Sequence, residues 1–328
     1  MFVSASEGNE EAGRPVPTDP VSAPDASLMP FAQPWGRRGM GTAVKVALTI
    51  LALLVLTAIF APVLTSVTGS PAPGASDTSS LSRSFGTPAG PSAAHWFGVD
   101  GLGRDVFSRT LYGARVSLLV AFCAAALSLL VGVTLGMIAG FRRGLTDSLI
   151  SRLIETFLVI PYLLLAIGIT ASCSTGGGCL NGTLTPGIPL VILVIAMTSW
   201  PVVARIVRNQ TLAIRESDYV TAARLAGLSP ARILATEVLP NLASSIFVFA
   251  IVLLPQAILA EAALTFLGVG VPASTPSWGG MIARDATLFP DTWWIMVFPG
   301  AALLITVFAC TVVADYVRDL TFGGRVAT

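Results

Sequence analysis

Charge is scarce in this chain: Asp, Glu, Lys and Arg make up 11% of its 328 residues, and 54% are hydrophobic. Soluble globular proteins carry about a quarter charged residues. The net charge is only +1, and the basic side chains are dispersed rather than grouped, so nothing points to a nucleic-acid partner. The composition therefore indicates a membrane protein.

Lysine and histidine each occur once, which disfavours nucleotide-binding and catalytic sites that need these residues. Lys45 stands at the start of the first apolar run, and no G-x-x-x-x-G-K-[ST] phosphate loop is present. His95 lies beside Trp96 without a triad context. We interpret it as a loop or interface residue, the alternative being a catalytic or metal role. We expect no catalytic residue, metal or cofactor in this chain, which disfavours a membrane-embedded hydrolase.

Long apolar runs take the place of charge. A bilayer core is crossed by roughly 20 apolar residues in a helix. Six runs qualify, which predicts an all-α protein with six transmembrane helices at about 43–64, 117–140, 153–172, 187–206, 242–268 and 293–317. The first run starts too late and is too long for a cleaved signal peptide.

The segments around these runs suggest a division of the chain. Prolines and acids dominate the start, which predicts a disordered tail over 1–42. A Pro/Ser/Gly-rich loop over 65–94 follows the first anchor helix at 43–64. We expect a five-helix core over 95–317 that includes a polar loop at 207–240, and then a short tail over 318–328.

Basic residues indicate the orientation, because cytoplasmic loops are enriched in Lys and Arg. With the N-terminus inside, 14 basic side chains are cytoplasmic and 5 are external, as counted along the sequence. Both termini and the loop at 207–240 are then cytoplasmic.

Four cysteines fall into two settings. Cys123 and Cys310 lie inside apolar runs and are read as small core residues. Cys173 and Cys179 bracket "STGGG" in a short loop on the external, oxidising side. We predict a disulfide between them; free thiols are the alternative, and metal binding by two ligands is weaker still.

The phrase "DYVTAARLAGLSP" at 218–230 predicts a short helix, a tight corner and a second helix. Ser217 or Asp218 can cap the first helix, and Gly227 suits a left-handed terminator. Ser229 and Pro230 can begin the second helix, which should run to near Pro240.

Within the first helix, the small Ala222 and Ala223 between Tyr219 and Arg224 suit close approach by another protein surface. The alternative is an amphipathic helix on the lipid surface. Such a helix needs a wide apolar face and a basic one, and this segment has neither.

"AARLAG", followed at a distance by Leu239 and Pro240, resembles the EAA loop of bacterial ABC importer permeases. Thr221 stands where that motif usually has Glu, and Glu237 where it usually has Ile. The resemblance implies that the loop docks on a cytoplasmic ATPase subunit. The residues it assigns to this coupling are Asp218, Tyr219, Thr221, Ala222, Ala223, Arg224 and Gly227.

Other blocks resemble the second permease of dipeptide, oligopeptide and nickel importers, over about 95–320. They are "FGVDGLGRDVFSRTLYGARVSL", "IPYLLLAIGI", "LAEAALTFLGVGVPASTPSWGGMI" and "WWIMVFPG". The resemblance implies a type I ABC importer permease in a bacterial cell membrane. Its implied partners are a homologous permease, two ABC ATPases that hold ATP and Mg²⁺, an extracytoplasmic substrate-binding protein, and membrane lipid.

Glu261 is an acid inside a predicted span, so it should face a cavity or a polar partner. It could line the peptide pathway or gate, or make a structural hydrogen bond. Pro255 can kink the same span, either for a gate or for packing. Before span two, Arg104, Asp105, Arg109 and Arg115 among apolar residues predict an external interfacial helix.

The competing function is a self-sufficient secondary transporter driven by protons or sodium. It predicts inverted repeats and ionisable groups at the membrane midplane. The sequence shows no convincing repeat and almost no central charge. The sequence therefore favours a permease that depends on ATPase partners.

Overall fold

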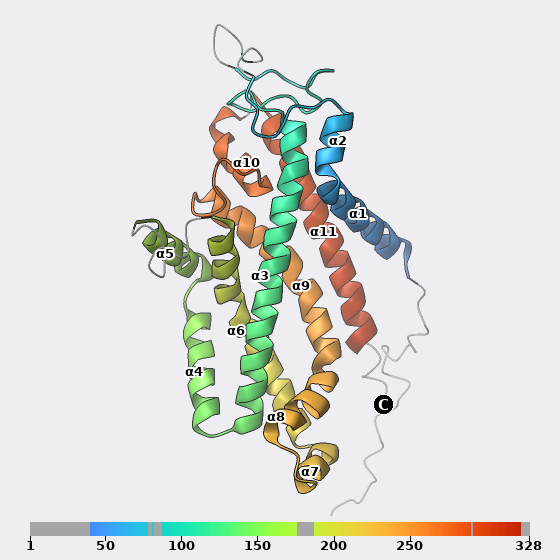
Figure 1. Cartoon of the computed structure of the whole chain (residues 1–328), viewed down its shortest axis with the longest axis vertical. Coiled ribbons are helices and arrows are strands. Elements are labelled where there is room, and N and C mark those ends of the chain that lie inside the picture. The colour runs from blue at the N-terminus through green and yellow to red at the C-terminus, as the bar shows by residue number, and fades with distance from the viewer. Residues whose placement is uncertain (1–39, 78–80, 82–86, 176–186, 290, 323–328) are drawn as a thin grey trace, which may run out of the picture.

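The computed structural model describes residues 40–77, 81, 87–175, 187–289 and 291–322. These residues form helices, with three isolated β-bridges in the loop before α3 (Figure 1). The helices are α1 (Thr42–Ile59), α2 (Ala61–Val67), α3 (Val106–Arg142), α4 (Leu145–Val159), α5 (Tyr162–Thr175), α6 (Ile188–Arg215), α7 (Asp218–Leu225), α8 (Pro230–Ile233), the π-helical turn η3 (Leu234–Val238), α9 (Leu239–Phe266), α10 (Trp278–Arg284), the 3₁₀ turn η4 (Ala286–Leu288) and α11 (Trp294–Phe322).

Five long apolar helices can each cross a membrane: α1, α3, the continuous run from Pro230 to Phe266, α6 and α11. The pair α4 and α5 passes the same test together, although the two helices meet at 93°. Counting this pair as one span gives six, which agrees with the predicted all-α fold.

The third predicted span, 153–172, is wrong as a single straight helix. α4 ends at Val159, and Ile160 is extended at φ −76° and ψ 125°. The cause is Pro161, because a proline disfavours helical backbone at the residue before it. α5 therefore leaves the bundle sideways (Figure 1).

Two other predicted boundaries also differ. The first predicted helix at 43–64 is divided between α1 and α2 at Phe60, next to Pro62 in the first turn of α2. The predicted interfacial helix before span two does not exist separately, because α3 is continuous from Val106. Asp105 caps α3 by accepting from the Ser108 N–H at 2.7 Å. At 37 residues, or about 55 Å, α3 exceeds a bilayer core of about 30 Å.

The α3–α6 seam is the contact between α3 and α6, and glycines let the two backbones meet there. Gly132, Gly136 and Gly140 recur every fourth residue and so share one face of α3. A Cβ on Gly136 would stand 2.6 Å from the Ala204 carbonyl oxygen, and one on Gly140 would stand 2.7 Å from that of Arg208. No side chain fits at these positions, so the stripe sets the distance between the helices.

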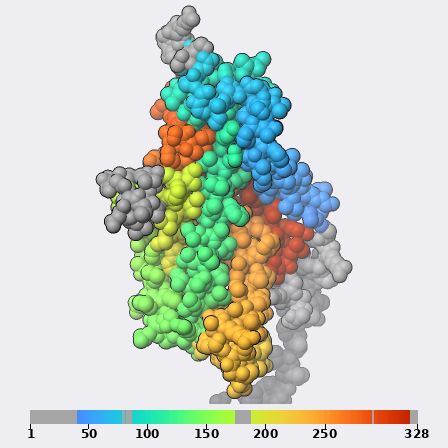
Figure 2. Space-filling view, viewed as in Figure 1, coloured from blue at the N-terminus to red at the C-terminus, as the bar shows by residue number. Residues whose placement is uncertain are grey.

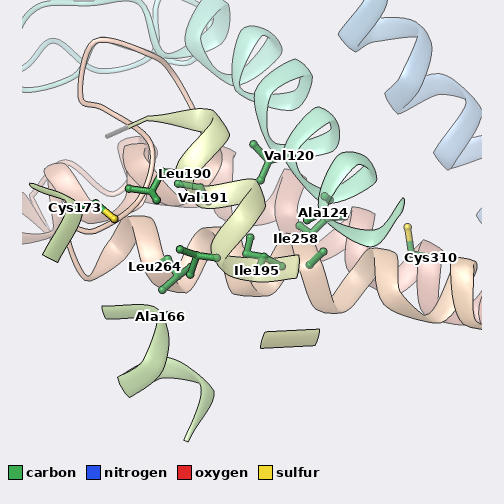
Figure 3. Close-up of a cluster of buried hydrophobic side chains, with 13 residues drawn as sticks. Val120, Ala124, Ala166, Cys173, Leu190, Val191, Ile195, Ile258, Leu264 and Cys310 are labelled. Atoms are coloured by element: carbon green, nitrogen blue, oxygen red, sulfur yellow. The ribbon is translucent and has the colours of Figure 1, made fainter. Parts of the chain in front are cut away.

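The main apolar core lies between α3, α6 and α9. Figure 3 shows Leu190, Val191 and Ile195 of α6 beside Ile258 and Leu264 of α9, and all five are almost completely buried. α3 closes this core with small residues. The core therefore ties together α3, α6 and α9.

The cap end, where α10 lies, carries a buried charge cluster that the sequence did not reveal. Asp100 accepts from the Arg104 Nε at 2.8 Å, and the Arg109 Nη1 donates to the Pro73 carbonyl at 2.9 Å. His95 places its Nδ1 3.0 Å from an Asp105 carboxylate oxygen. His95 is thus a loop residue that contacts the cap of α3, consistent with the structural interpretation.

Candidate functional site

The short helix α7 projects beyond the ends of α3 and α4 at the end of the bundle opposite α10 (Figure 1, Figure 2). Asp218, Thr221 and Ala222 are exposed, and the Tyr219 side chain is 43% exposed. Val220 points inward and is fully buried. α7 therefore rests on its own chain with one face and presents the other.

Gly227 ends α7 as predicted. Its φ is +80°, the left-handed region that favours glycine. The Leu228 N–H donates to the Ala223 carbonyl at 3.2 Å, and the Gly227 N–H donates to that of Arg224 at 3.0 Å. These two bonds make a Schellman motif. The corner is closed by backbone bonds, which fixes its shape.

Ser217 stands at the N-cap position of α7 as predicted, but its side chain does not make the predicted capping hydrogen bond. Ser217 precedes the helix, but its hydroxyl donates backwards to the Ile214 carbonyl at 2.6 Å. Asp218 is already the first helical residue. The reason is the tight turn out of α6, in which the Ser217 N–H also bonds Ile214 and brings the hydroxyl beside that carbonyl.

The two alanines of α7 face opposite ways, which corrects the expectation that both could meet a partner. Ala222 is exposed, whereas Ala223 is 8% exposed and packs in an apolar cluster with Val220 and Ile233. A large side chain at Ala223 would disturb this cluster. Ala222 is the alanine at which another surface can approach the backbone.

Arg224 and its neighbours tie α7 to the adjacent helix ends. The Arg224 guanidinium lies over the Phe141 ring of α3, 5.1 Å from its centroid. Just before α7, Glu216 accepts from Arg143 at 2.8 Å. The second pair is exposed and contributes little to stability. These contacts connect α7 and the turn before it to the end of α3.

The helix after the corner begins as predicted but does not stop near Pro240. Ser229 caps it by accepting from the Arg232 N–H at 3.4 Å, and Pro230 is its first residue. The chain then widens into η3 and continues as α9, with Pro240 in the first turn. A proline ring clashes with the carbonyl four residues earlier in an α-helix, and the π-helical turn relieves this clash.

Glu261 is fully buried and hydrogen-bonded. It accepts from the Ser117 hydroxyl at 2.9 Å and from the Thr265 hydroxyl at 3.0 Å. Ser117 in turn accepts from the Trp278 N–H at 3.3 Å. This geometry joins α3, α9 and α10, which favours the structural alternative for Glu261. Pro255 is buried inside α9.

Cys310 is buried as predicted, whereas Cys123 is only partly buried and Cys173 lies in helix α5 rather than in the predicted loop. Cys123 and Cys310 are free thiols. Cys173 is fully buried in α5 and is disulfide-bonded. Cys179 lies outside the described residues, so its pairing with Cys173 stays a prediction. Among the described residues, no group of three or more His, Cys, Asp or Glu side chains could hold a metal ion.

An ion pair that the sequence did not reveal fixes α4 to α6. Arg208 donates to Asp147 through Nε at 2.5 Å and Nη2 at 2.9 Å, a paired geometry. The two residues are 61 positions apart, so only the fold brings them together. Phe157 and Trp200 add an edge contact farther along, with ring centroids 5.5 Å apart.

These features describe a multi-pass bundle of apolar helices with one projecting polar corner. Residues 132–321 match the family described as binding-protein-dependent transport system inner membrane component. The chain belongs to this family of ABC importer permease subunits and is a multi-pass protein of the bacterial inner membrane.

The relatives agree with this membership, and a solved structure shares the fold. The chain is 36% identical to the dipeptide transport system permease protein DppC of Alkalihalophilus pseudofirmus, over 94% of this chain and 96% of that protein. It is 37% identical to the oligopeptide transport system permease protein OppC of Bacillus subtilis, covering 84% and 83%. A chain of the inward-facing MetNI methionine ABC transporter shares the fold, with a TM-score of 0.53, 18% identity, and coverage of 66% and 97%.

Proposed function

We propose that this chain is one permease half of an ATP-driven importer of peptides, and that the energy of ATP hydrolysis enters it through α7. The peptide cargo is supported by relatives named for dipeptide and oligopeptide transport. The observation that carries the coupling role is α7 itself, a projecting helix with an exposed small residue, Ala222, and a corner closed by Gly227.

The proposed assembly places α7 in the cytoplasm, in line with the 14 to 5 division of basic residues. A homologous permease pairs with this chain, and two ATPases bind ATP and Mg²⁺ below it. A substrate-binding protein delivers peptide at the cap end. Closure of the ATPases displaces α7, and the helices then move as rigid bodies to alternate access.

The test replaces the exposed alanine and the corner glycine. We expect Ala222→Trp to block approach of the ATPase, and Gly227→Val to strain the corner, because a β-branched residue disfavours φ of +80°. Both variants should insert and pair with the other permease, yet lose peptide-stimulated ATP hydrolysis and uptake by more than tenfold. Uptake by the wild type should survive collapse of the proton gradient and stop on ATP depletion.

Gly69→Val is the matched control. Gly69 has φ of +67° at the opposite end of the bundle, and like Gly227 it has open space around it. We expect this variant to transport normally. In addition, Ala222→Cys should cross-link to the ATPase with a yield that changes when ATP binds. Normal coupling in both α7 variants, without any such cross-link, would refute the role of α7.

A further inference from the structure

The bend between α4 and α5 lies beside a hollow of about 500 Å³. We call it the bend hollow. Its walls are the bend itself, together with Thr198, Ser199 and Val202 of α6 and Gln256 and Leu259 of α9. None of the thirteen residues that line it is charged.

Three helices bring residues of this hollow to similar distances from their ends nearest α7. At 1.5 Å per residue, Val159 lies about 21 Å from the start of α4. Ser199 lies about 24 Å from the end of α6, and Gln256 about 26 Å from the start of α9. All three distances are measured from the α7 end. The hollow therefore lies along helices that are long and apolar enough to cross a bilayer core of about 30 Å.

Backbone groups are left open at this depth. In a continuous helix the Phe157 carbonyl would accept from residue 161, but Pro161 has no N–H. The side chains around the break are open as well, with Val159 81% and Tyr162 49% exposed. Non-helical backbone is tolerated in the membrane only where protein buries it or where it lines a water-filled cavity.

The Gln256 side chain lines the same hollow, and its amide has no hydrogen-bond partner among the described residues. Its side chain is exposed, and within the described part of the chain no hydrogen bond reaches it. An amide that faces lipid without a hydrogen bond is strongly unfavourable. The Ser199 hydroxyl is equally unpaired among the described residues, whereas the Thr198 hydroxyl donates to the Ile195 carbonyl at 2.9 Å.

We propose that the bend hollow is this subunit's share of a hydrated peptide pathway, and that Gln256 and Ser199 hydrogen-bond the peptide backbone there. A glutamine amide both donates and accepts, as a peptide group does. An uncharged lining gives no preference for peptide side chains of one charge over the other. The site thus recognises the amide backbone and tolerates varied side chains. This inference rests on the proposed function and assigns the cargo contact to named residues.

Thiol labelling tests whether water and peptide reach the hollow. In the full importer, with Cys123 and Cys310 replaced by alanine, we expect Gln256→Cys to react with a charged, water-soluble methanethiosulfonate. Peptides from a casein hydrolysate, supplied with the binding protein and ATP, should slow this reaction severalfold. Leu304→Cys on α11 is the control, since Leu304 is 66% exposed and lies about 27 Å from the C-terminal end of its helix. It should stay unlabelled because it faces lipid.

Transport by side-chain variants gives the second readout. Gln256→Leu should reduce the maximal rate of peptide uptake about tenfold, Ser199→Ala less, and Gln256→Asn should restore part of the loss. Unchanged uptake in Gln256→Leu, or no labelling at 256, would overturn the inference while wild-type ATP-driven uptake still supported the proposed function. Dissociation of the two permeases in Gln256→Leu would also overturn it, by showing that the amide holds the partner. Absence of ATP-driven peptide uptake in the wild type would refute the proposed function itself.

Discussion

Two faces of α6 differ in how tightly they pack against their surroundings. Toward α3 it presents Val203, Ala204 and Val207, which pack against glycines with no room for another atom. Toward the bend hollow it presents Ser199 and Val202 beside open space. Helices in lipid gain little from the hydrophobic effect and are held by close packing. The α3–α6 seam therefore holds the subunit together, whereas the side of α6 at the hollow leaves open space.

The largest effect should come from filling the seam. Gly136→Leu would push a side chain into the Ala204 carbonyl at 2.6 Å, and the backbone cannot move aside. We expect a loss above the roughly 3 kcal/mol typical of overpacking, seen as failure to recover folded protein from membranes. Gly168→Leu is the control, because nothing lies within 4 Å of a Cβ on this glycine of α5. Equal yields of the two variants would contradict the assignment of the seam.

The second largest loss of stability is expected from removing the Glu261 carboxylate, which lies in the contact between α3 and α9. Glu261→Ala leaves the Ser117 and Thr265 hydroxyls without their acceptor, and each buried unpaired group costs about 1–3 kcal/mol. We expect a thermal midpoint several degrees lower in detergent, and a smaller loss for Glu261→Gln, which keeps an acceptor oxygen. A stable Glu261→Ala variant that fails only in transport would instead place Glu261 in the pathway.

The smallest loss of stability is expected from changes at two adjacent valines, one on each face of α6. Val203 is 1% exposed in the seam, and Val202 is 47% exposed at the hollow. We expect Val203→Ala to cost about 1–2 kcal/mol through the cavity it leaves, and Val202→Ala less than about 0.5 kcal/mol. Denaturant unfolding of the two variants in the same detergent measures the difference. A larger loss for Val202→Ala would reverse the roles assigned to the faces.

Hydropathy predicted the number of spans because burial in lipid acts on composition alone. It could not predict the bend. Pro161 breaks a helix, whereas Pro201, Pro255 and Pro299 lie within continuous helices. The difference depends on what surrounds each residue in the fold, and the sequence around a proline does not contain that information.

The corner after α7 could be predicted because it is formed by neighbouring residues. Gly227, Ser229 and Pro230 act through local backbone bonds, and the structure shows them in their expected places. The faces of Ala222 and Ala223, and the bonds of Glu261, depend on partners far along the chain. The spacing of Gly132, Gly136 and Gly140 was visible in the sequence as a G-x-x-x-G signal, although its partner helix was not.

The π-helical turn η3 has a consequence for residue counting. A wide turn holds one residue more than an α-helical turn, and each residue advances a helix by about 100°. The five residues Leu234–Val238 therefore set the angle at which every later side chain of α9 leaves the axis. Deleting one of them would convert the wide turn into an α-helical one and leave the later side chains in place, whereas deleting a residue of α9 between Val238 and Gln256 would rotate Gln256 out of the hollow and Glu261 away from Ser117. In this segment, the number of residues determines the orientation of the later side chains as much as the identity of those residues does.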